Sequence, residues 1–553
     1  MKMNWKKIPV IVGSIFFSVA SVFATSNERG IEFFRAELFD AAKIYLKNQT
    51  ENLQGTDLAE AFYFIGESFL ATNQLDSAAY FFQKAIQTDP EFPYGHIGEG
   101  KLALRNNNAK LADELFKKAL NLAKKDPAVP VAIAEAFIEV NQYARVGEFL
   151  DKARKIQKNF SGIYVAEGDM LMSQGDIGGA SGRYEMAMQF NPNDKIAHLK
   201  KARVYKTINP TAALEVLNQL LAIDPDYIPA FAALGDVYYR MNNYTKAIEA
   251  YQKFIGIPGV PVQQLFNYAS LLYFTKEFSK SLDLVNQVLE REPDNFVMRR
   301  LQFYDNFELG NFDLGLEQAK NFIQTGPQAD LIAQDFVYYG RLLNQSGNLQ
   351  AAIDAFNKAL SIDPAKTDIF KDLALAYEKK EDYSNAVVFY KKFIENDKNA
   401  TLLDVLNFGQ TAYRAGNQEV ITENRTTEEV AADSLIRRNY LLVADSAFAQ
   451  VIDRSPDSHL GYFWRARANF ALDPETTLGL AKPFYEQAAA KLEAMPEGTT
   501  RNNFLIESYR YLVFYYYSRG SKEDFSMAKE FAQKILAIDP ENEIALQVLK
   551  AIK

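Results

Sequence analysis

The chain has 553 residues, of which 48% are hydrophobic and 24% charged, so its composition is that of a folded protein and not of a disordered one. Its net charge of −9 argues against nucleic acid as the main partner, because phosphate binding needs a cationic surface. It contains no cysteine, which excludes disulfides, thiolate metal sites and cysteine nucleophiles. Its three histidines, His96, His198 and His459, lack metal-ligand spacing, so we expect neither a metal nor another cofactor.

The first 24 residues have the three parts of a secretory signal peptide. Lys2, Lys6 and Lys7 make a basic start, residues 8–23 are apolar, and Ala24 ends a small-residue cleavage site. The apolar run is shorter than the roughly 20 residues that a membrane-spanning helix needs, although an uncleaved anchor is the alternative. We therefore predict cleavage after Ala24 and an exported mature chain without a membrane span, which is periplasmic if the source is a Gram-negative bacterium.

From residue 25 onward the chain repeats itself with a period near 34 residues. Each repeat predicts two helices. A small residue in the first helix lets the second approach, an aromatic residue in the second fills the gap to the next repeat, and proline ends it. Three stretches share the separations 12, 4, 3 and 5: Gly66, Ala78, Phe82, Ala85 and Pro90; Gly168, Ala180, Tyr184, Ala187 and Pro192; and Gly340, Ala352, Phe356, Ala359 and Pro364.

This pattern resembles the tetratricopeptide repeat. The resemblance implies an all-α, right-handed α-solenoid of about fourteen helix pairs, because a single pair cannot bury its apolar face alone. The first pair begins near Asn27, and a capping helix follows Pro540. Residues 464–475 and 480–493 resemble exported tetratricopeptide-repeat proteins of Bacteroidetes-type bacteria, which supports a periplasmic location.

Three stretches interrupt the period. Residues 255–264 contain two prolines and two glycines and predict a tight turn between repeats or, less favoured, a hinge. After Gly416 the expected small residue, Ala444, comes 23 residues late, so residues 417–433 are an acidic insertion that forms a loop plus an elongated second helix, or an extra short helix. Residues 495–503 predict a loop. The resulting segments are the signal peptide 1–24, an N-terminal array 25–261, a continuing array 262–416, the insertion 417–433, and C-terminal repeats with the capping helix, 434–553.

No catalytic motif accompanies the repeats. The sequence has no P-loop, no zinc-protease motif and no serine-hydrolase elbow. Carboxylate pairs such as Glu428 and Glu429 lie in polar stretches without an apolar pocket. We therefore predict that the protein is not an enzyme.

The remaining candidate for a functional site is the surface of the predicted solenoid. In proteins of the resembled family the first helices line a concave groove, and residues one turn either side of the small residue point into it. The mixture of polar and aromatic residues at these positions suits an extended peptide or a protein surface better than a small apolar ligand, although a solvated face without a ligand is the alternative at each position. The candidate groove residues are Tyr63, Glu67, Asp169, Asp236, Tyr239, Arg240, Arg341, Asn344, Lys371, Gln410 and Arg414.

These observations predict a non-catalytic scaffold that binds protein partners of the cell envelope through the groove and the insertion. The alternative is a protein that binds glycan or cell-wall polymer through groove tyrosines and the aromatic run between Tyr511 and Tyr517. At helical spacing the rings of this run fall on several faces, so we expect most of them to pack against neighbouring helices.

Overall fold

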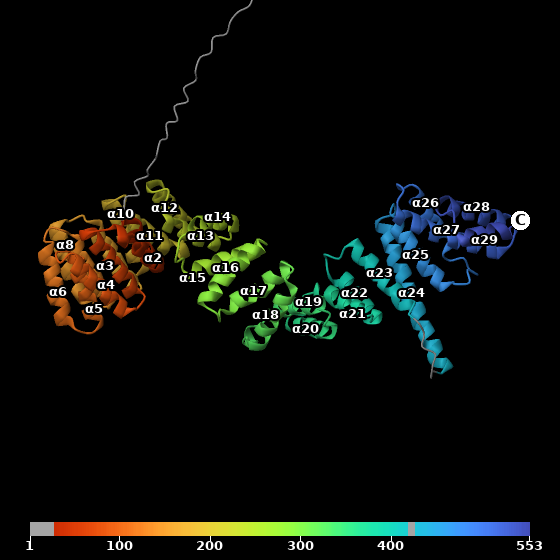
Figure 1. The fold of residues 1–553 in the computed structure, drawn as a ribbon, viewed down its shortest axis with the longest axis horizontal. Coiled ribbons are helices and arrows are strands. Elements are labelled where there is room, and N and C mark those ends of the chain that lie inside the picture. The colour runs from red at the N-terminus through yellow and green to blue at the C-terminus, as the bar shows by residue number, and fades with distance from the viewer. Residues whose placement is uncertain (1–26, 419–425, 553) are drawn as a thin grey trace, which may run out of the picture. The chain divides into compact units, whose positions relative to one another are not determined.

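A computed structural model describes residues 27–418 and 426–552 (Figure 1). Within these ranges the chain forms 29 α-helices, two short 3-10 turns and no strand. The helices make fourteen successive antiparallel pairs with one helix left at the C-terminal end, so the predicted all-α solenoid is confirmed. The predicted signal peptide, residues 1–24, lies outside the described residues, as do residues 419–425 of the predicted insertion.

Each pair has a first and a second helix, and within each of the two compact units described below consecutive pairs stack on one another. The first helices are α1 (Glu28–Arg35), α3 (Gly55–Ala71), α5 (Pro93–Arg105), α7 (Ala128–Glu139), α9 (Ser161–Ser173), α11 (Lys195–Ile208), α13 (Ile228–Arg240), α15 (Val262–Phe274), α17 (Phe296–Glu308), α19 (Ala333–Gln345), α21 (Ile369–Lys379), α23 (Leu402–Gly416), α25 (His459–Leu472) and α27 (Thr499–Arg519). The second helices are α2 (Phe39–Gln49), α4 (Leu75–Thr88), α6 (Ala109–Leu122), α8 (Tyr143–Ile156), α10 (Ile177–Phe190), α12 (Pro210–Ile223), α14 (Tyr244–Phe254), α16 (Phe278–Arg291), α18 (Phe312–Thr325), α20 (Leu349–Ile362), α22 (Tyr383–Asn396), α24 (Thr427–Arg454), α26 (Lys482–Glu493) and α28 (Lys522–Ile538), and α29 (Glu543–Ala551) follows them.

The repeated glycine and aromatic residue lie against each other within a pair. A Cβ atom built on Gly66 would lie 2.6 Å from the ring of Phe82, and one built on Gly340 would lie 2.5 Å from the ring of Phe356. Gly168 has the same relation to Tyr184. The absence of a side chain at these glycines therefore lets the ring of the second helix press directly onto the first helix.

The turn between the first and second helix recurs with the same backbone conformation. Asn73, Asn107, Asn141 and Asn242 have φ angles of 57° to 59°, in the left-handed region. Asparagine tolerates this region because its short side chain can hydrogen-bond locally, and it ends a helix in the same way as glycine does. Glu37 occupies the corresponding position between α1 and α2, with a φ of 64°.

The chain divides into two compact units, residues 1–298 (unit 1) and residues 299–553 (unit 2). The boundary falls inside α17, in a stretch where the repeat pattern is degenerate. Each unit is a stack of helix pairs in its own right. The domain boundaries expected from the sequence remain predictions.

The proline-rich stretch after α14 is a turn inside unit 1. Gly259 has a φ of 73° and lies so close to α2 that an added Cβ would be 2.8 Å from the backbone nitrogen of Ala41. The turn is therefore packed against the start of α2, although the two segments are far apart in sequence.

The predicted insertion leads into the longest helix of the described chain. α24 has 28 residues, and Thr426 and Glu429 form a capping box at its start. For the described residues, the structure thus has the elongated second helix, one of the two forms that the sequence left open. The predicted loop at 495–503 is shorter than expected, because α27 begins at Thr499 and Arg501 donates hydrogen bonds to the carbonyl groups of Leu492 and Glu493.

Candidate partner-binding surface

Charged side chains join several consecutive first helices, and α3, α5 and α7 also contact one another directly. In unit 1, Lys101 on α5 lies 2.5 Å from a carboxylate oxygen of Glu67 on α3 and 2.8 Å from one of Glu139 on α7. The side chains of Lys101 and Glu67 are only 5% and 4% exposed. One cation thus holds three successive repeats together away from water.

Burial dominates the chemistry of this cluster. It raises the pKa of Glu67 to about 7, although the ammonium group of Lys101 acts in the opposite direction. Tyr63, which lies one turn before Glu67, is also buried and contacts the rings of Phe82 and Tyr94. These two predicted groove residues therefore offer little surface to a partner.

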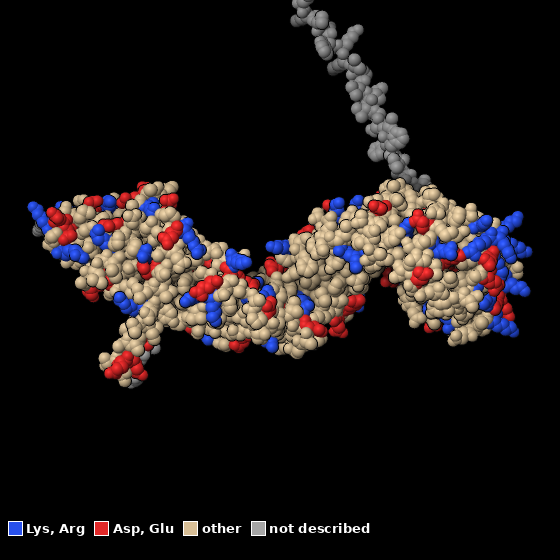
Figure 2. All heavy atoms as spheres, turned by 180° about the vertical axis from the view of Figure 1, so that it is seen from behind, with Lys and Arg blue, Asp and Glu red and all other residues tan. Residues whose placement is uncertain are grey.

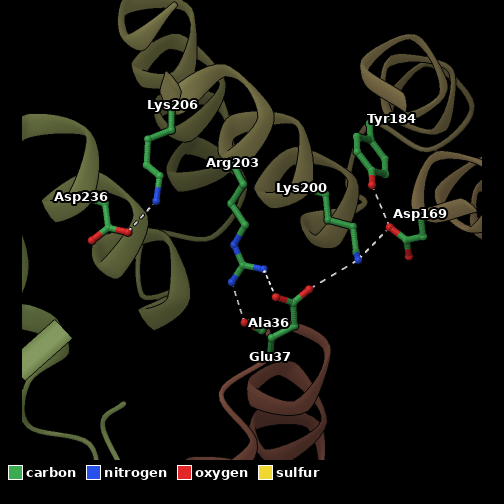
Figure 3. Close-up of polar contacts among 8 residues, drawn as sticks. All are labelled: Ala36, Glu37, Asp169, Tyr184, Lys200, Arg203, Lys206 and Asp236. Carbon is green, nitrogen blue, oxygen red and sulfur yellow. Dashed lines mark hydrogen bonds and ion pairs between the residues drawn. The ribbon is translucent and has the colours of Figure 1, made fainter. Parts of the chain in front are cut away.

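The next two predicted groove residues hold α11 in place. Asp169 accepts a hydrogen bond from the hydroxyl group of Tyr184 at 2.8 Å and lies 2.9 Å from Lys200 (Figure 3). Asp236 accepts a hydrogen bond from Tyr251 at 2.6 Å and lies 3.0 Å from Lys206. Asp169 therefore links α10 to Lys200 of α11, and Asp236 links α14 to Lys206 of α11.

α11 also contacts the corner between α1 and α2, which precedes it by about 160 residues. The guanidinium group of Arg203 donates a hydrogen bond of 2.6 Å to the carbonyl oxygen of Ala36 and lies 3.0 Å from the carboxylate of Glu37 (Figure 3). Beside this contact, Leu38, Val237 and Pro261 line an open pocket. This contact could not be predicted from the sequence, because nothing in the repeat pattern links the first pair to the sixth.

In unit 2 the same kind of pairing continues. Arg341 lies 2.8 Å from Asp372, and Lys371 lies 2.7 Å from Asp404. Arg414 forms an ion pair with Glu378. These three cations are predicted groove residues, and each one joins a first helix to its neighbour.

The remaining predicted groove residues differ in exposure. Arg240 is exposed, whereas Gln410 is half-buried. Tyr239 is half-buried against the ring of Tyr244. Asn344 is half-buried, and its side-chain oxygen has no hydrogen-bond partner within the described residues. Whether any predicted groove residue contacts a ligand stays a prediction.

The N-terminal part of α24 is a surface that the sequence located only in part. Residues 427–436, here called the α24 arm, precede the part of α24 that packs on α23, where Leu441 lies against Gly416, and acidic atoms gather at the arm's tip (Figures 1 and 2). Leu435, Ile436 and Leu442 are 60%, 51% and 47% exposed. The two leucines are seven residues apart, which places them on one side of a helix. This spacing is the feature of the sequence that could have indicated the surface.

The aromatic run near the C-terminus is mostly packed. Tyr509 and Tyr511 are buried, and Tyr511 stacks on Tyr485 with ring centroids 4.7 Å apart. Phe514 and Tyr517 are 47% and 40% exposed. Most rings thus serve the contact between α27 and its neighbours, which leaves two for any stacking on a polymer.

The described residues contain no group of three or more histidine, aspartate or glutamate side chains that could hold a metal ion. None of the helices in residues 27–418 and 426–552 is long and apolar enough to cross a membrane.

Comparison with known protein families agrees with the repeat. Family profiles described as "Tetratricopeptide repeat" match residues 209–253 and 372–399, and one described as "TPR repeat" matches residues 340–381. These stretches contain α12 to α14 in unit 1 and α19 to α22 in unit 2.

Two relatives illustrate how far the similarity extends. The chain is 21% identical over 418 residues to the TPR repeat-containing protein MJ1428 of Methanocaldococcus jannaschii, an alignment that covers 64% of this chain and 72% of the relative. It is 32% identical over 93 residues to the small glutamine-rich tetratricopeptide repeat-containing protein 2 of Mycosarcoma maydis, which covers 17% of this chain and 26% of the relative. The chain thus spans only about a quarter of the second protein.

Solved structures of similar proteins include two from bacteria of the type suggested by the sequence. The C-terminal part of a TPR repeat-containing protein from Cytophaga hutchinsonii is 25% identical, with coverage of 51% of this chain and 99% of that one and a TM-score of 0.40. A tetratricopeptide repeat protein from Parabacteroides merdae is 19% identical, with coverage of 45% and 98% and a TM-score of 0.29. From the matched profiles and the fourteen recurring helix pairs, the chain is a tetratricopeptide-repeat protein.

Proposed function

We propose that this protein is a non-catalytic scaffold of the cell envelope that binds other proteins, with the α24 arm as its principal contact. Tetratricopeptide-repeat proteins generally mediate protein–protein interactions, and the family typically has no catalytic role. The envelope location rests on the predicted signal peptide. The exposed first-helix face contributes a second, extended contact.

The apolar face of the α24 arm is the observation that carries the proposal. Leucine and isoleucine side chains that are 60% and 51% exposed on a projecting helix cost solvation free energy unless another surface covers them. The acidic residues of the first turn, Glu428 and Glu429, put negative charge at the end of the arm. Exposed apolar side chains with charged residues at their edge are typical of a protein-binding surface.

Binding of a glycan or cell-wall polymer is the second candidate. Its support is the pair of exposed rings, Phe514 and Tyr517, on α27. Stacking on exposed aromatic rings is how proteins hold extended polymers whose units present flat faces. Two exposed rings make only a small platform.

Replacing Leu435 and Ile436 together with aspartate is expected to reduce partner capture at least tenfold, because the central apolar contact is lost. The measurement is quantitative co-purification with the tagged full chain from the envelope fraction. The matched control is Leu314→Asp, at a leucine that is 50% exposed on α18 and lies outside the arm. Unchanged capture by the arm variant would place the contact elsewhere, whereas an equal loss in both variants would indicate a non-specific effect of added charge.

A further inference from the structure

α11 is a cationic helix in an acidic protein. Its fourteen residues contain Lys195, Lys200, Lys201, Arg203 and Lys206 and no acidic residue, in a chain with a net charge of −9. At 100° per residue, all of these cations except Lys201 fall within about 140° of the helix circumference. They therefore form a strip along one side of α11.

Most residues that neutralise this strip lie on neighbouring helices. Asp169 on α9 and Asp236 on α13 belong to the adjacent first helices, Asp224 follows α12 and pairs with Lys195, and such pairing follows from the stacking of neighbouring repeats. The others come from α1 and from the corner that follows it. Glu32 on α1 pairs with Lys195 across 163 residues of sequence, and Arg203 binds the carbonyl oxygen of Ala36 at the corner across 167 residues.

The carboxylate of Glu37, at the corner, faces α11. Glu37 has a φ of 64°, whereas the same turn position in four other pairs is asparagine with nearly the same angle. A glutamate is less favourable in the left-handed region than asparagine or glycine, because its Cβ atom crowds the backbone there. Glu37 lies 3.0 Å from Arg203 and 3.8 Å from Lys200. A strained glutamate is therefore kept where its side chain contacts two cations.

Similar charged residues at this turn position do not all make such a contact. Lys276 and Glu381 are also in the left-handed region, so a charged residue there is not by itself a sign of function. Glu37 is distinguished by the long-range contact, in which its carboxylate and the adjacent carbonyl group of Ala36 are bound by the same guanidinium group (Figure 3).

We infer that Lys200 and Arg203 form a carboxylate-binding site on the first-helix face of unit 1, which the corner of residues 36–38 occupies as an internal ligand. An acidic turn of a partner protein, with one carboxylate beside a free backbone carbonyl group, takes the same place when it displaces the corner. This inference rests on the proposed protein-binding function and names the chemistry of a second contact, separate from the α24 arm.

The ion pairs of the corner are weak enough to be exchanged, because the side chains of Arg203 and Glu37 are 33% and 55% exposed and water screens such pairs. A partner must in addition replace the apolar contact of Leu38, which is buried in the corner. A tethered corner competes at an effective concentration of about millimolar, so a partner needs additional contacts to displace it. Displacement therefore couples binding at this site to binding elsewhere on the protein.

The test uses the full chain and the absence of native cysteines. Cysteines introduced at the exposed positions Asn48 on α2 and Thr207 on α11 carry spin labels, and pulsed electron paramagnetic resonance measures the distance between them. The variant Glu32→Lys/Glu37→Lys repels the corner from α11, so its distance distribution is expected to broaden and shift to longer values. A parallel melting curve checks that the variant is folded.

Binding is measured with a fluorescent peptide of residues 28–40, which contains the corner, and with a control peptide in which glutamine replaces Glu32 and Glu37. The glutamate peptide is expected to bind Glu32→Lys/Glu37→Lys at least tenfold more tightly than it binds the unmodified chain. Lys200→Gln/Arg203→Gln, introduced into that variant, should remove this binding. Equal binding of both peptides, or binding that survives the loss of both cations, would overturn the inference. Neither outcome affects capture through the α24 arm, so the two proposals fail separately.

Discussion

Replacing Lys101 with methionine is expected to lower the free energy of local unfolding of α3 and α5 by about 3–5 kcal/mol. Lys101 is 5% exposed at its side chain and lies between Glu67 and Glu139. Methionine fills the space but leaves the carboxylate of Glu67 buried without its counter-ion. Hydrogen exchange of the amides in α3 and α5 of the full chain measures this loss locally, which suits a repeat protein because its unfolding need not be all-or-none.

The loss should depend on pH through Glu67. The pKa of Glu67 is raised from 4.5 to about 7 in the folded chain, so the folded state keeps a proton that the unfolded state releases between these values. The proton on Glu67 stabilises the folded state fully below about pH 4.5. This stabilisation, about 3 kcal/mol in total, is lost as the pH rises through 7. The Lys101→Met variant should therefore lose less at pH 5 than at pH 8.

Glu67→Gln is the matched control for this effect. It removes the titrating group and keeps the shape of the side chain, so the pH-dependent loss in α3 and α5 should become smaller than in the unmodified chain. A loss of less than about 0.5 kcal/mol in the free energy of local unfolding of Lys101→Met at pH 8 would contradict this account of the cluster. The buried ion pair would then not hold the repeats together.

Gly340→Leu is expected to destabilise α19 and α20 by about 1–3 kcal/mol through overpacking. Even a single added carbon atom at Gly340 would lie 2.5 Å from the ring of Phe356, which is fully buried. A contact this short requires the ring or the two helices to move apart. Thermal unfolding and hydrogen exchange of these two helices measure the effect.

Two variants make the Gly340 result specific. Lys358→Gln, at an exposed position of the same helix pair, should be near neutral. Phe356→Ala is destabilising alone, but combined with Gly340→Leu it should recover part of the loss, because the new side chain fills the space of the ring. Equal destabilisation by Gly340→Leu and Lys358→Gln, or simple additivity in the double variant, would contradict the close contact.

The repeat made most of the fold predictable. Contacts within a pair and between neighbouring pairs depend on residues at fixed separations, so Gly340 and Phe356 could be placed on facing helices from counting alone. The asparagines at Asn73 and Asn107 offered a further periodic signal, because the turn needs a left-handed residue every 34 positions.

The candidate site was less predictable, because it depends on contacts that the period does not encode. The position directly after Gly340 placed Arg341 on a first helix, but the sequence did not show that Asp372 on the next first helix would bind it. The contact of Arg203 with Ala36 depends on how successive pairs turn relative to one another, which is set by small packing differences summed over several repeats. The exposure of Leu435 follows from the length of α24 beyond its partner helix, a property that the capped start at Thr426 determines.

Native mass spectrometry of the affinity-purified full chain from its envelope fraction distinguishes a protein scaffold from a polymer-binding protein. We expect one or two proteins bound in fixed stoichiometry, which dissociate when Leu435 and Ile436 are replaced with aspartate. A chain that carries no stoichiometric protein and is instead retained on isolated peptidoglycan or polysaccharide, with retention lost on replacement of Phe514 and Tyr517 by alanine, would contradict the account and establish polymer binding in its place.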